Sequence, residues 1–227
     1  MKKILIIEDD PAIVEGLTES LKNEHFEVIS SATGEKGYQL AKSENVDLII
    51  LDLILPDVDG TDICLRLRNE GVRVPVVMVT GKREEVDKII GLEIGATDYI
   101  TKPFNSRELV ARIKAIFRLM DDMKTGEVKN YKFDDIEIDF KKMEIIKAGK
   151  PLSLSVMELK ILKYMIERKG EVITRNDLLD SVWGYDIFPT TRVVDNYILA
   201  IRKKIEDDPA EPKHILTIYK AGYKFVE

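Results

Sequence analysis

Apolar and polar positions follow two patterns in the first half of the chain. Short apolar segments predict strands at residues 4–7, 26–30, 48–51, 74–79 and 98–100, and the run at 48–51, apolar without alternation, suits a strand covered on both faces. Apolar residues at three- and four-residue spacing predict helices between them, at about 11–22, 35–43, 60–69, 83–94 and 105–118. Strands that alternate with helices predict an α/β fold with a doubly wound, five-stranded parallel sheet.

Helix start signals support this division. Asp10 and Pro11 offer an N-cap and a residue suited to the first helical position. Asn105 or Ser106 can cap the last helix of this half, with Glu108 inside its first turn. The first and last helices are therefore expected to begin close to the ends of strands.

The pattern changes after a polar stretch, "RLMDDMKTGEVKN", at residues 118–130. Short strands are predicted at 131–133, 136–139 and 143–147, followed by three helices and a closing hairpin around Ala221 and Gly222. This order is typical of an α+β domain. The predicted organisation is a first domain at 1–120, a linker at 121–130 and a second domain at 131–227.

Two helices of the second half carry the spacing of a capping box. Ser155 and Glu158 precede one helical pattern, and Thr174 and Asp177 precede the next. Gly170 ends the first of them. The second half is thus predicted to contain separate, well-delimited helices.

Composition narrows the class of protein. The chain has 227 residues, of which 44% are apolar and 33% charged, as in ordinary globular proteins. No apolar run approaches the roughly 20 residues that span a membrane, and the N-terminal apolar run is too short for a signal peptide. A single cysteine, Cys64, fits a reducing cytosol, so a cytoplasmic protein is expected. Two histidines and one cysteine support neither a zinc site nor a Ser-His-Asp hydrolase.

The net charge of −6 is unevenly distributed. Residues 1–122 hold 16 Lys and Arg against 23 Asp and Glu, which leaves 19 against 18 for the second half. The acidic half is therefore a poor nucleic-acid surface, whereas the second half can carry one if its positive charges cluster.

Carboxylates follow two of the predicted strands. The first strand ends in Glu8, Asp9 and Asp10, and the third ends in Asp52. In an open parallel sheet, functional groups gather outside the carboxyl ends of the strands, at the topological switch point. Carboxylates packed together repel one another unless a cation joins them, and carboxylate oxygens with waters suit Mg²⁺. A carboxylate beside bound Mg²⁺ can attack phosphorus and become an aspartyl phosphate.

Two further strand ends extend this pocket. Thr80 ends the fourth strand with a hydroxyl group, and Lys102 follows the fifth. Lysine can pair there with a carboxylate or a phosphate as a point charge. A cis peptide bond before Pro103 would direct Lys102 inward.

At these motifs, "ILIIEDD", "DLIILDLILPDVDG", "VVMVTG" and "GATDYITKPF", residues 1–120 resemble the flavodoxin-like receiver domain of bacterial two-component response regulators. The resemblance implies that Asp52 accepts a phosphoryl group from a separate histidine kinase, with Mg²⁺ as cofactor. The residues implied for the metal are Glu8 (through water), Asp9, Asp52 and the backbone carbonyl of Ile54, and those implied for the chemistry are Asp52, Thr80 and Lys102. Asp10 is predicted to act only as a helix cap.

The resemblance also implies a switch and a dimer. Thr80 would move toward the phosphoryl group and Tyr99 would swing inward. Phosphorylation would then favour a homodimer whose two copies pair charges across a two-fold axis. The implied pairs are Lys88–Glu108, Glu93–Lys114 and Asp98–Arg112.

The third helix of the second half, "TTRVVDNYILAIRKKI", has one apolar stripe and one basic face. Four basic residues against one aspartate give it a charge of +3. Helix, helix, basic helix and hairpin is the order of a winged helix-turn-helix, whose third helix enters the major groove of double-stranded DNA.

Residues 130–227 resemble the output domain of the OmpR/PhoB-type transcription regulators at "LSVMELKILKYMI", "VWGYD" and "ILTIYKAGYKF". The residues implied for DNA binding are Arg192, Asn196, Tyr197, Leu199, Ala200, Arg202, Lys203 and Lys220. Trp183 and residues 184–189 fall where relatives touch DNA or RNA polymerase, although Trp183 can equally be a core residue.

The sequence departs from its relatives in the residues expected to read DNA. Ala200 stands where a basic residue is usual, Leu199 is apolar, and the hairpin has Tyr219 and Lys220 in place of Arg-Gly. Fewer arginines mean fewer bidentate contacts to guanine. The hypothesis is a site rich in A·T, with Leu199 or Ala200 against thymine methyl groups.

Two other functions stay open at this stage. The output domain can bind a protein in place of DNA, although its basic helix and hairpin favour DNA. A phosphatase of the haloacid-dehalogenase type also uses Mg²⁺ and an aspartyl phosphate, but it needs an acid/base aspartate two residues after the nucleophile. That position holds Ile54, so the chain is not predicted to be an enzyme.

Overall fold

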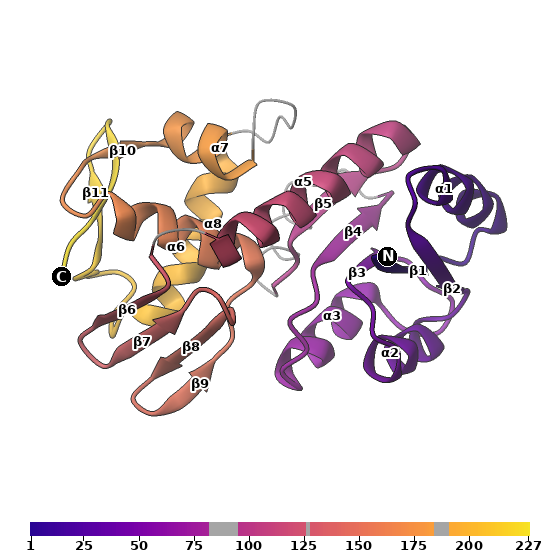
Figure 1. The fold of residues 1–227 in the computed structure, drawn as a ribbon, viewed down its shortest axis with the longest axis horizontal. Coiled ribbons are helices and arrows are strands. Elements are labelled where there is room, and N and C mark those ends of the chain that lie inside the picture. Colours follow the sequence, from indigo (N-terminus) through magenta and orange to yellow (C-terminus); the bar gives the residue numbers. More distant parts are fainter. Residues whose placement is uncertain (82–94, 126–127, 184–190) are drawn as a thin grey trace. The chain divides into compact units, whose positions relative to one another are not determined.

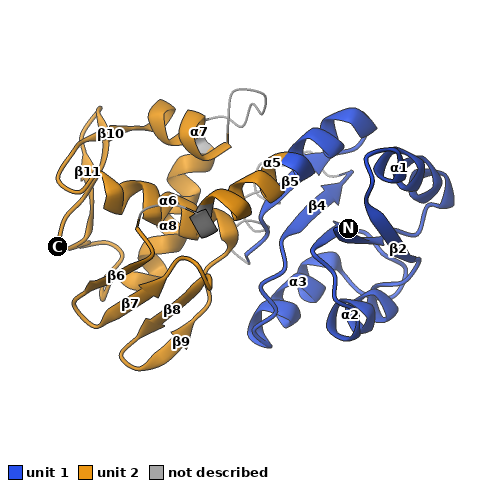
Figure 2. Ribbon diagram, in the orientation of Figure 1, with its two compact units in different colours: residues 1–114 blue, residues 115–227 orange. Residues whose placement is uncertain are grey.

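The computed structural model describes residues 1–81, 95–125, 128–183 and 191–227, without the side chains of 123–125, 191 and 192. The chain divides into two compact units, residues 1–114 and 115–227 (Figure 2). The predicted helix at 83–94 lies outside the described residues, as do Lys88, Glu93 and the loop at 184–189.

The first unit is a five-stranded parallel sheet between helices (Figure 1). Helices α2 and α3 cover one face of the sheet, and α1 and the first part of α5 lie on the other. The elements are β1 (Lys3–Ile7), α1 (Pro11–Asn23), β2 (Glu27–Ser31), α2 (Gly34–Ser43), β3 (Leu48–Asp52), α3 (Gly60–Asn69), β4 (Val76–Thr80), β5 (Asp98–Thr101) and α5 (Ser106–Thr125). The predicted doubly wound sheet is confirmed.

The strand order, β2-β1-β3-β4-β5, places the first and third strands side by side. Ile7 at the end of β1 lies in register with Leu51, one residue before the end of β3. All residues of β3 and β4 are buried, because helices cover both faces. The rigid centre of the sheet therefore presents the ends of β1, β3 and β4 at one edge.

The second unit has a four-stranded antiparallel sheet, three helices and a small three-stranded sheet. Its elements are β6 (Asn130–Phe133), β7 (Ile136–Asp139), β8 (Glu144–Lys147), β9 (Lys150–Leu152), α6 (Val156–Glu167), β10 (Ile173–Thr174), α7 (Arg175–Trp183), α8 (Thr191–Ile205), β11 (Ile215–Ile218) and β12 (Gly222–Phe225). The predicted winged-helix architecture is confirmed. Strands β9 and β10 were not predicted, because two or three residues are too short for a periodic pattern.

The predicted capping groups are largely confirmed. The Asp10 side chain accepts hydrogen bonds from the backbone at the start of α1, and Ser155 and Glu158 form a capping box on α6. Helix α5 continues to Thr125, beyond the predicted end at 118, since the sequence has no glycine or proline from 105 to 125. It therefore enters the segment predicted as a linker. No helix among the described residues is long and apolar enough to cross a membrane.

Gly60, the first residue of α3, is expected to be irreplaceable. A Cβ atom there would lie 2.2 Å from the backbone oxygen of Asp52, so Gly60→Ala should lower the free energy of unfolding by about 2 kcal/mol or more. Gly16 within α1 has no described atom within 4 Å of its Cβ position, and Gly16→Ala should stabilise by about 0.5–1 kcal/mol. Urea unfolding followed by circular dichroism measures both, and equal stability of the two variants would contradict the close approach.

Candidate functional site

The side chains predicted at the strand ends meet at the carboxyl edge of the sheet. Glu8 follows β1, Asp52 ends β3, Thr80 ends β4 and Lys102 follows β5. Glu8, Asp52 and Thr80 are 2%, 4% and 2% exposed, and Lys102 is partly exposed. The rigid strands hold these groups at the rim of a covered sheet.

Three carboxylates form the acidic side of this pocket. Glu8, Asp9 and Asp52 each offer an oxygen atom, and these atoms lie within 4.8 Å of one another. Two of the side chains are buried and Asp9 is exposed, so the cluster opens to solvent on one side. An all-oxygen donor set at this spacing fits a small hard cation such as Mg²⁺.

Lys102 supplies the positive charge of the pocket. Its Nζ donates hydrogen bonds to Oδ2 of Asp52 at 2.7 Å and to Oε1 of Glu8 at 2.8 Å. Burial raises the pKa of Glu8, and the hydrogen bond from Lys102 only partly offsets this effect. Burial alone would lower the pKa of Lys102, but its hydrogen bonds to Asp52 and Glu8 raise it above the usual value. The predicted cis peptide bond before Pro103 is present.

The loop after β3 orients the carboxylate of Asp52. The backbone N–H of Ile54 donates to Oδ1 of Asp52 at 3.0 Å, so each oxygen of Asp52 has a different partner. The side chain of Ile54 is 55% exposed, which leaves only its backbone to act in the pocket.

The predicted switch residues lie on adjacent strands. Thr80 faces Thr101 across the β4–β5 pair, and the backbone N–H of Lys102 donates to the Thr80 carbonyl at 2.7 Å. Tyr99, in register with Met78, is partly buried against the core between the sheet and α2 and α3. A displacement of Thr80 would therefore act directly on the end of β5.

The described charges of the predicted dimer surface form ion pairs within the chain. Arg112 binds Asp98 at 3.0 Å and Glu108 at 2.9 Å, and Lys114 binds Glu24 at 2.6 Å. A second copy would have to exchange these partners for its own.

Helix α8 of the second unit has the predicted amphipathic form. Val194, Ile198, Ile201 and Ile205 are at most 2% exposed. On the other side, Leu199 is 41% exposed and Lys203 is exposed. Asn196 is partly exposed, and the side chain of Arg192 is not among those described.

Two residues predicted to contact DNA are buried. Tyr197 is 1% exposed, with its ring centroid 5.4 Å from that of Trp183, and Ala200 is 3% exposed. Their side chains pack inside the unit, and Tyr197 packs against Trp183 of α7. Ala200 is therefore withdrawn as a thymine contact and Tyr197 as a DNA contact, and Trp183, 4% exposed, is a core residue.

Arg202 also has a structural role that the sequence did not reveal. Its Nε donates to the carbonyl of Ile215 at 2.9 Å, and its Nη2 donates to Oγ1 of Thr217 at 2.8 Å. Both acceptors lie on β11, the first strand of the hairpin. Arg202 thus joins α8 to the hairpin through its Nε and Nη2 groups.

A second polar cluster joins the same elements. Asp195 Oδ1 accepts hydrogen bonds from Arg175 Nε at 2.6 Å and from the Tyr223 hydroxyl at 2.5 Å. Burial and the Asp195 carboxylate raise the pKa of Tyr223 to about 12, so its hydroxyl stays a donor at neutral pH. Helix α7, helix α8 and strand β12 are therefore fixed to one another.

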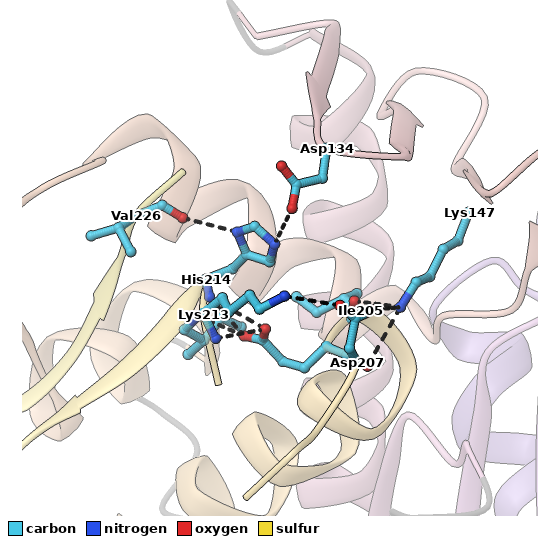
Figure 3. A network of polar contacts seen from close by, with 9 residues as sticks. Asp134, Lys147, Ile205, Asp207, Lys213, His214 and Val226 are labelled. Atoms are coloured by element: carbon cyan, nitrogen blue, oxygen red, sulfur yellow. Dashed lines mark hydrogen bonds and ion pairs between the residues drawn. The ribbon is translucent and has the colours of Figure 1, made fainter. Parts of the chain in front are cut away.

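The C-terminal end of α8 is anchored to the four-stranded sheet. Lys147 Nζ donates to the carbonyl of Ile205 at 2.8 Å and pairs with Asp207 at 3.6 Å (Figure 3). His214, beside this group, contacts Asp134 and the carbonyl of Val226. A cation at the carboxyl end of a helix is favourable, because the last carbonyls lack partners within the helix.

The turn of the hairpin presents two exposed residues. Tyr219 is 84% exposed, and Lys220 Nζ lies 5.3 Å from its ring centroid. Lys220 has a φ of 59°, a conformation that favours glycine and that matches the Arg-Gly of relatives. Tyr219 was not predicted as a site residue, although an aromatic residue in a polar hairpin turn is itself a signal.

Comparison with known proteins identifies a family for each half of the chain. Residues 4–114 match the family described as a response regulator receiver domain, and residues 149–225 match the C-terminal part of transcriptional regulatory proteins. The first unit is thus a receiver domain, a class that binds Mg²⁺ at an acidic pocket like that of Glu8, Asp9 and Asp52. The second is a DNA-binding winged-helix domain.

Full-length relatives place the chain more narrowly. It is 37% identical to the sensory transduction protein RegX3 of Mycolicibacterium smegmatis, over 99% of both chains. It is 40% identical to the alkaline phosphatase synthesis transcriptional regulatory protein PhoP of Bacillus subtilis, over 100% of this chain and 97% of the relative.

Solved structures give the same result. A mutant of RitR matches with a TM-score of 0.82 and 28% identity, over 99% of both chains. The Thermotoga maritima OmpR/PhoB homologue DrrB matches with a TM-score of 0.53 and 34% identity, over 100% of both. The chain belongs to the OmpR/PhoB family of two-component response regulators, which act as transcription factors and not as enzymes.

Replacement of Lys102 by methionine should destabilise the first unit in a pH-dependent way. Without Lys102 the pKa of Glu8 rises further, and a raised carboxyl pKa costs stability as the pH rises above the unfolded value. We expect a loss of about 2 kcal/mol at pH 7, below the roughly 3–5 kcal/mol of a fully buried pair, and a smaller loss at pH 4. Urea unfolding in the presence of a metal chelator, at both pH values, measures this loss of stability.

The surface pair Lys42–Glu70 provides the control, because Lys42→Met removes the same charge from an exposed site. A loss for Lys102→Met that is no larger than this control, or that is independent of pH, would contradict the interpretation.

Proposed function

We propose that Asp52 accepts a phosphoryl group from a histidine kinase and so controls binding of the second unit to DNA. The observation that carries this proposal is the pocket itself. A nearly buried carboxylate, Asp52, lies at the open rim of a rigid sheet, beside Lys102 and two further carboxylates. Such a group is fixed in direction and still open to a donor.

The chemistry is a transfer between two nucleophiles. An oxygen of Asp52 forms a bond to phosphorus while the bond from phosphorus to the kinase histidine nitrogen breaks, and that nitrogen keeps the electron pair. Lys102 can move from the Asp52 carboxylate to a phosphoryl oxygen without leaving the pocket. The Thr80 hydroxyl lies at the adjacent strand end, where it can bind another of these oxygens.

Asp9, Asp52 and the carbonyl of Ile54 would hold Mg²⁺ directly, and Glu8 would act on it through water. The metal ion would neutralise negative charge on the carboxylate and phosphoryl oxygens. Lys102, which now balances Glu8 and Asp52, would then be available for the phosphoryl group.

The kinase would dock beside this pocket. A groove of about 450 Å³ lies between α1 and the segment that follows β5, lined by Ala12, Ile13, Gly16, Leu17, Lys102, Pro103, Phe104 and Ser106. Its lining is mostly apolar, and it includes Lys102 of the pocket. A partner helix in this groove could bring its phosphohistidine to Asp52.

The signal would pass from Thr80 to Tyr99 and then to the face of β5 and α5, where two copies would pair. Asp98, Glu108, Arg112 and Lys114 would exchange their present partners for those of the second copy, together with Lys88 and Glu93. An isologous dimer requires such self-complementary charges. The exposed charges among them would set register more than affinity, because exposed ion pairs contribute little, whereas the side chains of Asp98 and Arg112 are only 12% and 14% exposed.

The output unit would bind double-stranded DNA through α8 and the hairpin. Asn196, Leu199 and Lys203 lie on the accessible side of α8. At the hairpin tip, we propose Tyr219 as a DNA contact in addition to Lys220. The apolar Leu199 supports preference for A·T pairs through thymine methyl groups. Arg202 would act by fixing the hairpin, whereas Arg192 would contact DNA. RNA polymerase would be a further partner, and the regulator would act in the cytoplasm.

Replacement of Asp52 by asparagine should abolish phosphorylation. Treatment of the full chain with phosphoramidate and Mg²⁺ should add one phosphoryl group, seen by mass spectrometry, and Asp52→Asn should gain none. Asp10→Asn is the matched control, since asparagine also serves as an N-cap and Asp10 lies outside the proposed acceptor. Phosphorylation of Asp52→Asn, or its loss in Asp10→Asn, would contradict the assignment.

Lys203 and Arg202 should respond differently to alanine substitution. If Lys203 contacts a phosphate, Lys203→Ala should weaken binding to all DNA sequences and reduce the salt dependence by roughly one unit, and because its side chain is exposed it should cost less stability than Arg202→Ala. Arg202→Ala should lower the free energy of unfolding, because the hairpin loses its hydrogen bonds to α8. Gel shift titrations over a range of salt and urea unfolding separate the two.

Lys141→Ala removes an equal charge from the exposed turn after β7 and serves as the control. Equal loss of binding in this variant would show a general charge effect. Absence of DNA binding by the phosphorylated wild type would favour a protein-binding output domain.

A further inference from the structure

Helix α2 receives its N-terminal cap from a distant loop. The backbone N–H groups of Gly34 and Glu35 donate to Oδ1 and Oδ2 of Asp57, at 2.8 and 2.9 Å. Thr33 holds the N-cap position with extended backbone, but within the described structure its side chain makes no capping hydrogen bond. A carboxylate from the β3–α3 loop thus caps the helix in place of the side chain at the N-cap position.

The same loop packs tightly against the start of α2. A Cβ atom on Gly34 would lie 2.5 Å from Val58 Cγ1 and 3.1 Å from Leu55 Cδ1. Leu55 and Val58 are partly buried against the core beside Ile63. Glycine at position 34 allows the helix and the loop to approach until both oxygens of Asp57 reach the helix.

The near end of this loop forms part of the phosphoacceptor pocket. The N–H of Ile54 holds Oδ1 of Asp52 at 3.0 Å, and the N–H of Leu53 donates to the carbonyl of Val79 on β4 at 3.0 Å. The N–H of Gly60 donates to the carbonyl of Leu53 at 3.0 Å, which closes the loop on itself. The segment between Asp52 and α3 is therefore a small closed unit with Asp57 on its outer side.

The charges around Asp57 are consistent with a permanently ionised cap. Hydrogen bonds from the backbone N–H groups of Glu35 and Gly34 hold the pKa of Asp57 below its usual value. The neighbouring carboxylate of Glu35 is turned to Arg66 on α3, at 2.7 Å. Repulsion between Glu35 and Asp57 is thereby reduced.

We propose that Asp57 is a positioning residue for phosphoryl acceptance. By tying the β3–α3 loop to the N-terminus of α2, it keeps the Ile54 amide on Asp52 and the Ile54 carbonyl directed to the metal position. The proposal rests on the function proposed above. Asp57 touches neither substrate nor metal and acts only through the loop.

The test must separate this role from simple capping of α2. Asp57→Ala removes both the cap and the tie to the loop. Asp57→Ala combined with Thr33→Asp restores a cap from the N-cap position of the helix, since aspartate is among the best N-cap residues, but it does not rebuild the tie. Glu35→Gln weakens the link from α2 to α3 without touching the loop and is a control for general effects on α2.

Three quantities are measured on the full chain: the free energy of unfolding, the Mg²⁺ affinity without phosphodonor by calorimetry, and the rate of phosphorylation by phosphoramidate at saturating Mg²⁺. For Asp57→Ala we expect lower stability, Mg²⁺ affinity reduced by roughly tenfold and slower phosphorylation. For the double variant we expect stability to return while Mg²⁺ affinity and rate stay low. Glu35→Gln should keep the wild-type Mg²⁺ affinity and the wild-type rate of phosphorylation.

Recovery of Mg²⁺ affinity and rate in the double variant would overturn the proposal and leave Asp57 a helix cap only. Wild-type Mg²⁺ affinity and rate in Asp57→Ala would overturn it as well. Both outcomes differ from failure of the proposed function, in which wild-type chain itself would gain no phosphoryl group on Asp52.

Discussion

The receiver unit depends on one interaction, the contact of the Lys102 ammonium with two nearly buried carboxylates. Glu8 and Asp52 come from neighbouring strands, and without a cation their charges would oppose the close pairing of β1 and β3 at this edge. The Lys102 ammonium offsets this repulsion by donating hydrogen bonds to both carboxylates. Because it arrives from β5, the pocket also ties the end of β5 to the centre of the sheet. Charge balance and strand order therefore support each other.

The contacts of a side chain also distinguish residues that can bind a partner from residues that only stabilise the fold. In the output unit, Arg202 and Asp195 are polar and lie on α8, yet their hydrogen bonds join that helix to the hairpin and to α7. In contrast, Leu199 and Tyr219 are apolar but exposed. Residue type alone would assign these roles in the opposite way. A basic face on a helix is thus divided between groups that fix its position and groups that are exposed to solvent.

The sequence predicted most of the receiver pocket, because strand ends are local features and a parallel sheet brings them together at one edge. It could not predict that Tyr197 and Ala200 are buried, since helical periodicity does not say which neighbouring elements cover α8 beyond its apolar stripe. It also missed the role of Asp57, whose partners Gly34 and Glu35 are more than twenty residues away. Local patterns give positions along an element, whereas such contacts depend on how elements pack.

A phosphoryl group on Asp52 would change the charge that Lys102 balances, and the consequences follow from the contacts of Lys102. Its backbone N–H is bound to the carbonyl of Thr80, so side chain and backbone link β3, β4 and the end of β5. Asp98, at the other end of β5, is paired with Arg112 on α5. The side chains of Arg112 and Asp98 are only 14% and 12% exposed, and Arg112 also binds Glu108, so a shift of β5 would change the balance between these two partners. A local charge change is thereby converted into a choice between ion-pair partners, as a reversible switch requires.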